Sequence, residues 1–345
     1  MTRAQERPNK PRVGITAGDP AGIGPEIVLK SAADGNISDA CDLVIVGDMT
    51  EFREQASVLG LNCDYQAIDQ VALAEKGSLG VSLLDIGRQR ESINWGVVSG
   101  ESGRAALKSI EMATALCLEG KLDAIATAPI NKESLKQAGS AFPGHTELLA
   151  ALCGARESLM CFFARDLRVA LLTTHLSLAE AIKAITQERV VAALSLLDRE
   201  LRRFGIDEPR IAVAGLNPHA SEHGLFGHEE GQHIEPAISD CTARGLRVSG
   251  PFPADTLFLR AARGEFDAVL ACYHDQGLIA VKCLSFGDAV NVTLGLPIIR
   301  TSVDHGTAFD IAGRGIADHR GMVKAIKLAA DLVRRQIRVE ELTRL

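Results

Sequence analysis

Several features that would place this chain in other protein classes are missing from its 345 residues. The formal net charge is −7, so the chain lacks the excess of basic residues with which nucleic-acid binders neutralise phosphates. No apolar run reaches the about 20 residues that a membrane-spanning helix needs. The opening stretch, MTRAQERPNKPR, contains no apolar segment that could act as a secretory signal. We therefore expect no nucleic-acid partner and no membrane partner.

The cysteines lack the paired spacing of a metal or redox motif. None of the eight forms a CxxC pair, and most lie in apolar stretches such as FDAVLACYH. Buried reduced thiols are the simplest interpretation, because disulfides persist mainly in oxidising compartments. The sequence therefore predicts a cytoplasmic protein.

The usual nucleotide-binding fingerprints are missing as well. The glycines of GITAGDPAGIGPEI do not have the GxGxxG spacing, and no GxxxxGK[ST] loop occurs. A second stretch, DHGTAFDIAGRGIAD (304–318), combines glycine amides that a nucleotide can approach with an aspartate able to bind ribose hydroxyls. We predict that this stretch binds the adenosine half of a dinucleotide, with these candidate contacts: His305, Gly306, Asp310 and Gly313.

Apolar runs of strand length recur along the chain and alternate with helical patterns. The runs are 12–19, 42–48, 122–129, 168–175, 210–219 and 267–275. Their hydrophobicity is continuous, which is typical of parallel strands covered on both faces. The sequence therefore predicts the α/β class, with mainly parallel sheets flanked by helices and with polar sites at the carboxyl ends of strands. Residues 61–99 show the least regular pattern, which suggests an edge hairpin or a crossing between domains.

Three histidines stand at equivalent places, each at the end of an apolar run. They are His175 in TTH, His219 in NPH and His274 in CYHD. Neutral imidazole suits Zn, Co, Mn or Ni, and three protein ligands leave positions open for substrate oxygens. The spacing matches no finger-type motif, and a single histidine of this kind is more simply a structural one. Taken together, the three predict a catalytic metal site, which Asp275 could support by orienting His274.

A series of motifs now identifies a family. Together they resemble the 4-hydroxythreonine-4-phosphate dehydrogenases from about residue 12 to residue 335: GITAGDPAGIGPEI, PGHTE, TTHLSL, GLNPHA, GPFPADT, YHDQG and NVTLGLPIIRTSVDHGTAFDIAGRG. The last motif also resembles the adenine-side loop of isopropylmalate and isocitrate dehydrogenases. The resemblance implies their two-domain fold, with the active site in the interdomain cleft. We expect residues 1–125 and 288–345 to form the cofactor-side domain, and residues 126–287 to carry the metal ligands and dimer contacts.

The resemblance also implies roles for individual residues. A divalent metal (Zn, Co, Mn or Mg) would be held at His175, His219 and His274, in a homodimer whose partner subunit completes the active site. A small anionic substrate would be contacted by His145, Thr146, Lys282, Asn291 and Arg300. Lysine and arginine supply positive charge for such a substrate, and arginine can bind it through two parallel hydrogen bonds. Lys282 or Asp255 is the candidate proton acceptor.

The implied reaction is NAD-linked oxidation (NADP is the alternative) of a hydroxyl β to a carboxylate, followed by decarboxylation. The favoured substrates are 4-hydroxythreonine-4-phosphate, an intermediate of pyridoxine biosynthesis, and threonate 4-phosphate. The alternative is a terephthalate-type cis-dihydrodiol carboxylate of aromatic catabolism. A sensor that binds metal and nucleotide without turnover, and an acyl-phosphate transferase on a related fold, are further hypotheses.

One segment departs from the family pattern. Where the family commonly has NPHAGEGG, this chain has NPHASEHG, with Ser221 and His223 at glycine positions. Side chains there could reshape the substrate pocket, and the flat ring of His223 could stack on an aromatic substrate.

Overall fold

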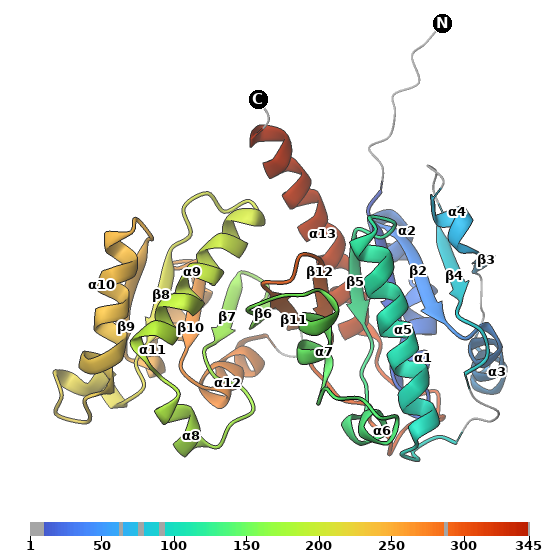
Figure 1. Ribbon diagram of the computed structural model, residues 1–345, viewed down its shortest axis with the longest axis horizontal. Helices are drawn as coiled ribbons and strands as arrows, with labels where there is room; N and C mark the ends of the chain where they lie inside the picture. The colour runs from blue at the N-terminus through green and yellow to red at the C-terminus, as the bar shows by residue number, and fades with distance from the viewer. Residues whose placement is uncertain (1–9, 62–64, 75–78, 90–93, 286–288, 344–345) are drawn as a thin grey trace, which may run out of the picture. The chain divides into compact units, whose positions relative to one another are not determined.

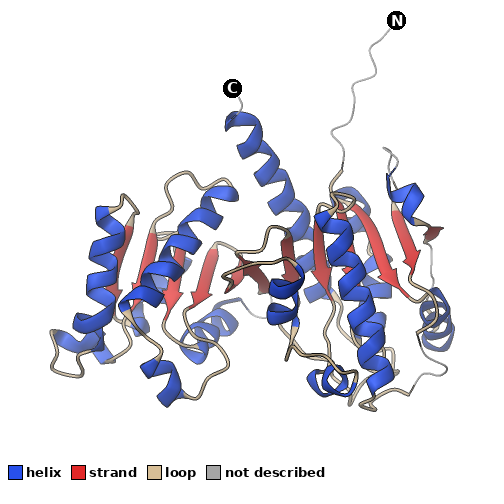
Figure 2. Ribbon diagram, in the orientation of Figure 1, coloured by secondary structure: helices blue, strands red, loops and turns tan. Residues whose placement is uncertain are grey.

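The computed structural model describes residues 10–61, 65–74, 79–89, 94–285 and 289–343. The chain divides into two compact units (Figure 1). Unit 1 comprises Met1–Ala155 and Pro297–Arg334, and unit 2 comprises Arg156–Leu296 and Arg335–Leu345. Helices flank the strands of each unit (Figure 2), which confirms the predicted α/β class.

Unit 1 is built on parallel strands in the order β3-β4-β2-β1-β5-β12. Their bounds are β1 (Arg12–Thr16), β2 (Asp42–Gly47), β3 (Gln66–Ile68), β4 (Val81–Asp85), β5 (Ala124–Thr127) and β12 (Ile299–Ser302). Every residue of β2 is buried, as its continuous apolar run predicts for a central strand.

The helices of unit 1 follow its strands along the chain. They are α1 (Gly24–Ala32), α2 (Gly35–Ala40), α3 (Met49–Leu59), α4 (Gln70–Ala74), α5 (Gly100–Leu118), α6 (Lys132–Gln137) and α7 (His145–Leu152). Asp48 caps the start of α3 by accepting hydrogen bonds from the amides of Thr50 and Glu51. Helix α5 packs closely on α6. Glycine at position 103 permits this approach, since a side chain there would collide with the carbonyl oxygen of Ser134.

Unit 2 has mixed strands in the order β11-β6-β7-β10-β8-β9. Their bounds are β6 (Leu159–Ala164), β7 (Leu167–Leu171), β8 (Ile211–Ala214), β9 (Val248–Phe252), β10 (Ala268–Ala271) and β11 (Val290–Leu294). Strand β6 is antiparallel to β7 and to β11, whereas β7, β10, β8 and β9 run parallel to one another.

The α-helices that begin in unit 2 are α8 (Leu178–Lys183), α9 (Gln187–Arg203), α10 (Glu235–Ala243), α11 (Ala254–Ala262) and α12 (His274–Ser285). A tight turn, η1 (Pro218–Glu222), follows β8, and a short π-helix, η2 (Glu230–Ile234), precedes α10. The last helix, α13 (Arg320–Thr343), contributes residues to both units. No helix of the described residues is both long and apolar enough to cross a bilayer.

The unit boundaries differ from those expected from the sequence. Residues 126–155 belong to unit 1, because β5 pairs with β1 and α6 packs on α5. Residues 289–296 belong to unit 2, because β11 pairs with β6. The stretch 61–99 contains no edge hairpin among its described residues: β3 and β4 are parallel, and α4 lies between them in the sequence.

The cysteines of the described chain are all free. Five are buried, Cys153 is half-buried and Cys283 is exposed, while Cys63 lies outside the described residues. The sequence interpretation of buried, unpaired thiols therefore holds for most of those described.

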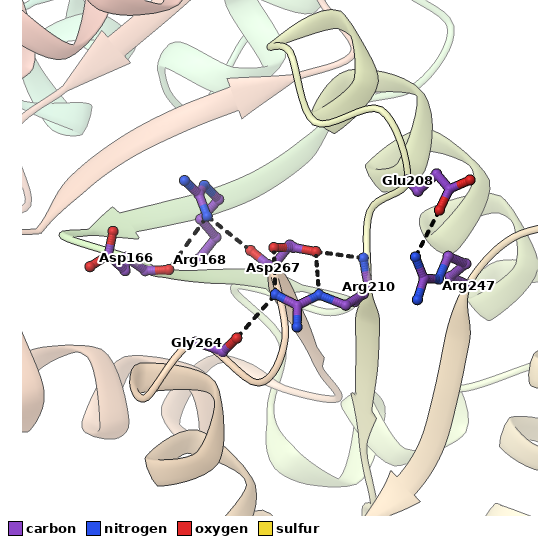
Figure 3. A network of polar contacts seen from close by, with 7 residues as sticks. All are labelled: Asp166, Arg168, Glu208, Arg210, Arg247, Gly264 and Asp267. Carbon is purple, nitrogen blue, oxygen red and sulfur yellow. Dashed lines mark hydrogen bonds and ion pairs between the residues drawn. The ribbon is translucent and has the colours of Figure 1, made fainter.

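An arginine–aspartate cluster joins the starts of three parallel strands of unit 2 (Figure 3). Asp267, just before β10, accepts hydrogen bonds from the backbone amide of Arg210 (2.8 Å) and from its Nε (3.0 Å) and Nη2 (3.1 Å). Arg168 of β7 donates to the backbone carbonyl of Asp267 at 3.2 Å. Burial acts to raise the pKa of the Asp267 carboxyl, but the hydrogen bonds and charge of Arg210 outweigh it, so this pKa is lowered.

Replacing this carboxyl should destabilise unit 2 in a pH-dependent way. We expect Asp267→Asn to lower the free energy of unfolding by about 1–2 kcal/mol at pH 7, since hydrogen bonds to a charged group are lost. A carboxyl with a lowered pKa in the folded state stabilises the protein above its unfolded pKa, about 3.9, and loses this contribution as the pH falls further. The difference between wild type and variant, measured by urea unfolding, should therefore shrink below about pH 4.

The matched control is Glu208→Gln, which removes the exposed partner of Arg247 in the same part of the unit (Figure 3). It should change stability little, because exposed ion pairs contribute little. Equal losses in the two variants, or a loss that is independent of pH, would contradict this account.

Candidate active site

The carboxyl ends of three neighbouring parallel strands, β7, β10 and β8, are tied together by side chains. Thr173, after β7, donates from Oγ1 to the carbonyl of Cys272, after β10, at 2.8 Å. Gln276 accepts from the amide of Cys272 at 2.7 Å and donates to the carbonyl of Gly215, after β8, at 2.7 Å. These bonds fix the backbone positions from which the three predicted metal ligands extend.

Two of the three histidines lie close together. The rings of His175 and His274 have centroids 5.9 Å apart, and Nδ1 of His274 lies 2.6 Å from Oδ1 of Asp275. That contact leaves Nε2 of His274 as the nitrogen able to bind a metal. His219 follows β8, the next strand along, but among the described residues no three His, Cys, Asp or Glu side chains are gathered closely enough to hold a metal ion as they stand.

His219 begins a run of backbone in the left-handed region. The residues from His219 to His223 all have positive φ, between 44° and 66°. Non-glycine residues pay a steric cost in this region, so such a run persists only where its surroundings hold it. Ser221 and His223, which occupy the family's glycine positions, belong to this run, and His223 is exposed.

Cys272 lies among these strand ends without being a candidate ligand. It is fully enclosed and its Sγ contacts the carbonyl oxygen of Ala214 at 3.2 Å. Burial, and then the neighbouring Glu230 carboxyl, raise the pKa of the Cys272 thiol to about 12. The side chain therefore remains a thiol at neutral pH, and the thiolate form that binds metals is absent.

Unit 1 places a buried cation beside a histidine. Arg300 of β12 is 2% exposed, and its Nε and Nη2 donate to Oγ1 of Thr127 at 3.1 and 2.7 Å. Burial lowers the pKa of Arg300 to about 9, so the guanidinium stays charged at neutral pH. Burial, and then the charge of Arg300, lower the pKa of His145 well below its usual value, so this ring is neutral.

The Nε2 atom of His145 is placed to bind a ligand. It is buried and has no hydrogen-bond partner among the described residues. His145 and Thr146 form the first turn of α7, where free backbone amides favour an anion. The structure thus brings Arg300 and His145 together, as the sequence expected for substrate contacts, and adds Thr127. Sequence reasoning missed Thr127, although a polar residue inside an apolar strand was a visible signal.

The other predicted substrate and catalytic residues lie in unit 2. Asn291 is on β11, with a buried Oδ1 that has no hydrogen-bond partner among the described residues. Lys282 is exposed on α12, eight residues after His274, and Asp255 is exposed in the first turn of α11.

The predicted cofactor loop, residues 304–318, is attached to the first glycine-rich turn of unit 1. The amide of Ile23 donates to the carbonyl of Thr307 at 2.9 Å, and a side chain at Gly22 would come within 2.8 Å of the same oxygen. Lys30 of α1 donates to the carbonyls of Gly315 (2.8 Å) and Ala317 (2.9 Å). The two glycine-rich segments, treated separately in the sequence, therefore form one assembly.

Within this loop the predicted contacts differ in their surroundings. Asp310 is exposed, and Nδ1 of His305 lies 3.0 Å from the carbonyl oxygen of Gly306. Gly313 has φ +76° and packs directly against the ring of Trp95, which leaves no room for a side chain. The indole Nε1 of Trp95 is buried and has no hydrogen-bond partner among the described residues. Trp95 is a second residue that sequence reasoning missed, because nothing in the motif around it signals this contact.

Parallel strands whose carboxyl ends gather histidines and charged side chains define an α/β enzyme. Residues 39–329 match the model of the family described as pyridoxal phosphate biosynthetic protein PdxA. The chain belongs to this family.

Known relatives agree with this membership. The chain is 47% identical to the D-threonate 4-phosphate dehydrogenase of Cupriavidus necator, with 94% of this chain and 98% of the relative covered. A crystal structure of 4-hydroxythreonine-4-phosphate dehydrogenase from Klebsiella pneumoniae superimposes on this structure with a TM-score of 0.87. The two sequences are 43% identical, with 96% of this chain and 99% of that chain covered. A terephthalate 1,2-cis-dihydrodiol dehydrogenase from Burkholderia xenovorans is similar at 28% identity, with a TM-score of 0.65 and coverage of 93% and 97%. The chain is therefore an oxidoreductase of the dehydrogenase type.

The left-handed run predicts an unusual response to glycine. A non-glycine residue costs about 1–2 kcal/mol in this region, and glycine costs about 0.5–1 kcal/mol of chain entropy on folding. We therefore expect His223→Gly to stabilise the protein by about 0.5–1 kcal/mol, measured as a higher urea midpoint.

His228→Gly is the control, since His228 is exposed in the same segment and does not have a positive φ. It should destabilise the protein slightly. A loss of stability in His223→Gly would show that the run is not strained.

Proposed function

We propose that the protein is a divalent-metal-dependent NAD-linked dehydrogenase that oxidises and decarboxylates 4-hydroxythreonine-4-phosphate or threonate 4-phosphate. The observation that carries the proposal is the pairing of buried Arg300 with a neutral His145 whose Nε2 has no partner among the described residues. A buried guanidinium and an imidazole N–H are suited to an anionic phosphate or carboxylate group.

The identity of the relatives favours a phosphorylated acid over a cis-dihydrodiol carboxylate. The proximity of His145 and Arg300 fits this choice, because each offers a donor to phosphate oxygens. Asn291, with its buried Oδ1, is proposed to accept a hydrogen bond from a hydroxyl or amino group of the same substrate.

The three imidazole side chains of unit 2 are of a type that binds divalent metal ions. His175, His274 and His219 extend from three adjacent strand ends, and Asp275 orients one of the rings. We propose that these three hold Zn, Co, Mn or Mg, and that His219 must approach the other two to do so. When bound, such an ion would stabilise negative charge on the substrate, and NAD (or NADP) would take up the electrons.

The proposed proton acceptor is Lys282, with Asp255 as the alternative. This base would take the hydroxyl proton as the substrate is oxidised, and a bound NAD would supply the acceptor for the hydride. In the resulting β-keto acid the bond to the carboxylate breaks, CO₂ leaves, and the electron pair passes to the keto group. The base then returns a proton to the carbon.

We further propose a homodimer with a shared active site. Several large apolar side chains of unit 2 are exposed, among them Leu225 (71%) and Ile279 (64%). We propose that exposed apolar side chains of this kind lie in the dimer interface. A cytoplasmic location is proposed because the described cysteines are mostly buried free thiols.

A direct test mixes the protein with NAD, a divalent ion and each candidate acid, and follows NADH formation. Turnover of a phosphorylated acid with release of CO₂ is expected. Arg300→Lys should lower kcat/KM roughly 10–100-fold, because lysine cannot keep the two hydrogen bonds to Thr127 that hold this positive charge in place. Arg244→Lys, at an exposed pair with Asp240, should not.

Turnover of only a cis-dihydrodiol carboxylate would replace the substrate assignment. Absence of turnover with every acid would show that the proposed reaction is wrong.

The single tryptophan of the chain provides a direct probe of the cofactor site. Because Trp95 packs on Gly313, NADH bound at residues 304–318 should quench its fluorescence and accept its excitation energy. We expect Asp310→Ala to raise the dissociation constant measured in this way roughly 10-fold or more, since a charged hydrogen bond to ribose is lost.

Asp318→Ala is the matched control, because this exposed carboxylate is already engaged by Arg320. Equal affinities for Asp310→Ala and wild type would move the cofactor away from this loop.

A further inference from the structure

A buried carboxyl stands behind the turn that carries His219. Glu230, at the start of η2, is 0% exposed. Its Oε1 accepts a hydrogen bond from the backbone amide of Asn217 at 2.6 Å, and its Oε2 accepts one from the Asn217 side-chain Nδ2 at 2.8 Å. Asn217 is two residues before His219, so both groups of one residue are held by one carboxyl.

Glu229 completes this contact. Its Oε2 accepts from the same Asn217 Nδ2 at 2.8 Å and from the amide of His228 at 3.1 Å. The hydrogen bond from Asn217 lowers the pKa of the Glu229 carboxyl. The Asn217 amide group is therefore fixed in one orientation, with its NH₂ between two carboxyls.

Two glycines let the surrounding backbone come close to Asn217 and to the turn. A side chain at Gly227 would lie 2.5 Å from Nδ2 of Asn217, and one at Gly215 would lie 2.8 Å from Cα of Ala220. The π-helical turn η2 is itself an irregular element, and such turns are frequent at functional sites. The left-handed run that starts at His219 is thus held at its entry by Asn217, which Glu229 and Glu230 bind.

We propose that Glu230 is a positioning residue for His219. By holding Asn217 through its backbone and its side chain, Glu230 fixes where the strained turn leaves β8, and so sets how far the His219 imidazole can reach toward His175 and His274. The proposal rests on the proposed function, because it takes His219 to be a metal ligand.

The test measures Co²⁺ binding to the metal-free full chain by calorimetry, without NAD or substrate. In Glu230→Gln, one carboxyl oxygen becomes an NH₂ group that faces the donor Nδ2 of Asn217, so one of the two contacts is lost. We expect Co²⁺ affinity to fall about 10-fold or more, as it does when groups that orient metal ligands are altered. The visible absorption of bound Co²⁺ should also change, because it reports ligand geometry.

Glu200→Gln is the matched control. Glu200 is another buried carboxyl of unit 2, but it bonds to Arg203 of its own helix. It should lose stability without losing Co²⁺ affinity. Asn217→Ala should weaken binding as Glu230→Gln does, and the double variant should lose less than the two single losses combined, because both act through one contact.

The variant His219→Ala tests the metal site separately from the positioning role of Glu230. If His219→Ala weakens Co²⁺ binding and Glu230→Gln does not, the positioning role is wrong and the metal site stands. If His219→Ala binds Co²⁺ as tightly as wild type, both the metal site and the positioning role are overturned. Equal losses of affinity in Glu230→Gln and Glu200→Gln would also overturn the positioning role.

Discussion

The parallel alignment of β7, β10 and β8 at their carboxyl ends is the constraint on which the candidate metal site depends. Two side chains enforce it, since Thr173 bonds β10 to β7 and Gln276 bonds β10 to β8. The Asp267–Arg210 cluster fixes the opposite ends of the same strands. With both ends held, residues that directly follow the three strands are brought to one edge of the sheet, whatever their separation in sequence.

Unit 1 achieves a comparable result through close backbone approach. Glycine at position 22 lets the first strand–helix turn touch the loop at Thr307, and Lys30 ties the far end of that loop to α1. The same unit buries Arg300 against Thr127 and so keeps a positive charge next to His145. Anion binding and dinucleotide binding are thereby proposed for one unit, and metal binding for the other.

The sequence predicted what depends on local pattern. Continuous apolar runs indicated the parallel strands. The position of each histidine after such a run predicted that His175, His219 and His274 would gather; His175 and His274 lie close together, but no group of three metal-binding side chains is found in the described part of the chain. The family's motifs supplied the identity.

What sequence could not predict depends on contacts between distant segments. Three such contacts leave no periodic signal in the sequence: Trp95 packs on Gly313, Arg300 bonds to Thr127, and Glu230 accepts hydrogen bonds from Asn217. The left-handed run could be suspected only from the family's glycines at the positions of Ser221 and His223, since its own residues are not the glycines that usually mark such backbone.

The proposed metal site requires three neighbouring strand ends to present their histidines to one ion, although only two of the histidines lie close together in the described chain. The most direct measurement is a crystal structure of the Co²⁺-loaded protein with anomalous scattering recorded at the cobalt edge. We predict one anomalous peak per chain, bonded to His175, His274 and His219. A peak bonded to other residues, or one that leaves His219 unbound, would contradict it.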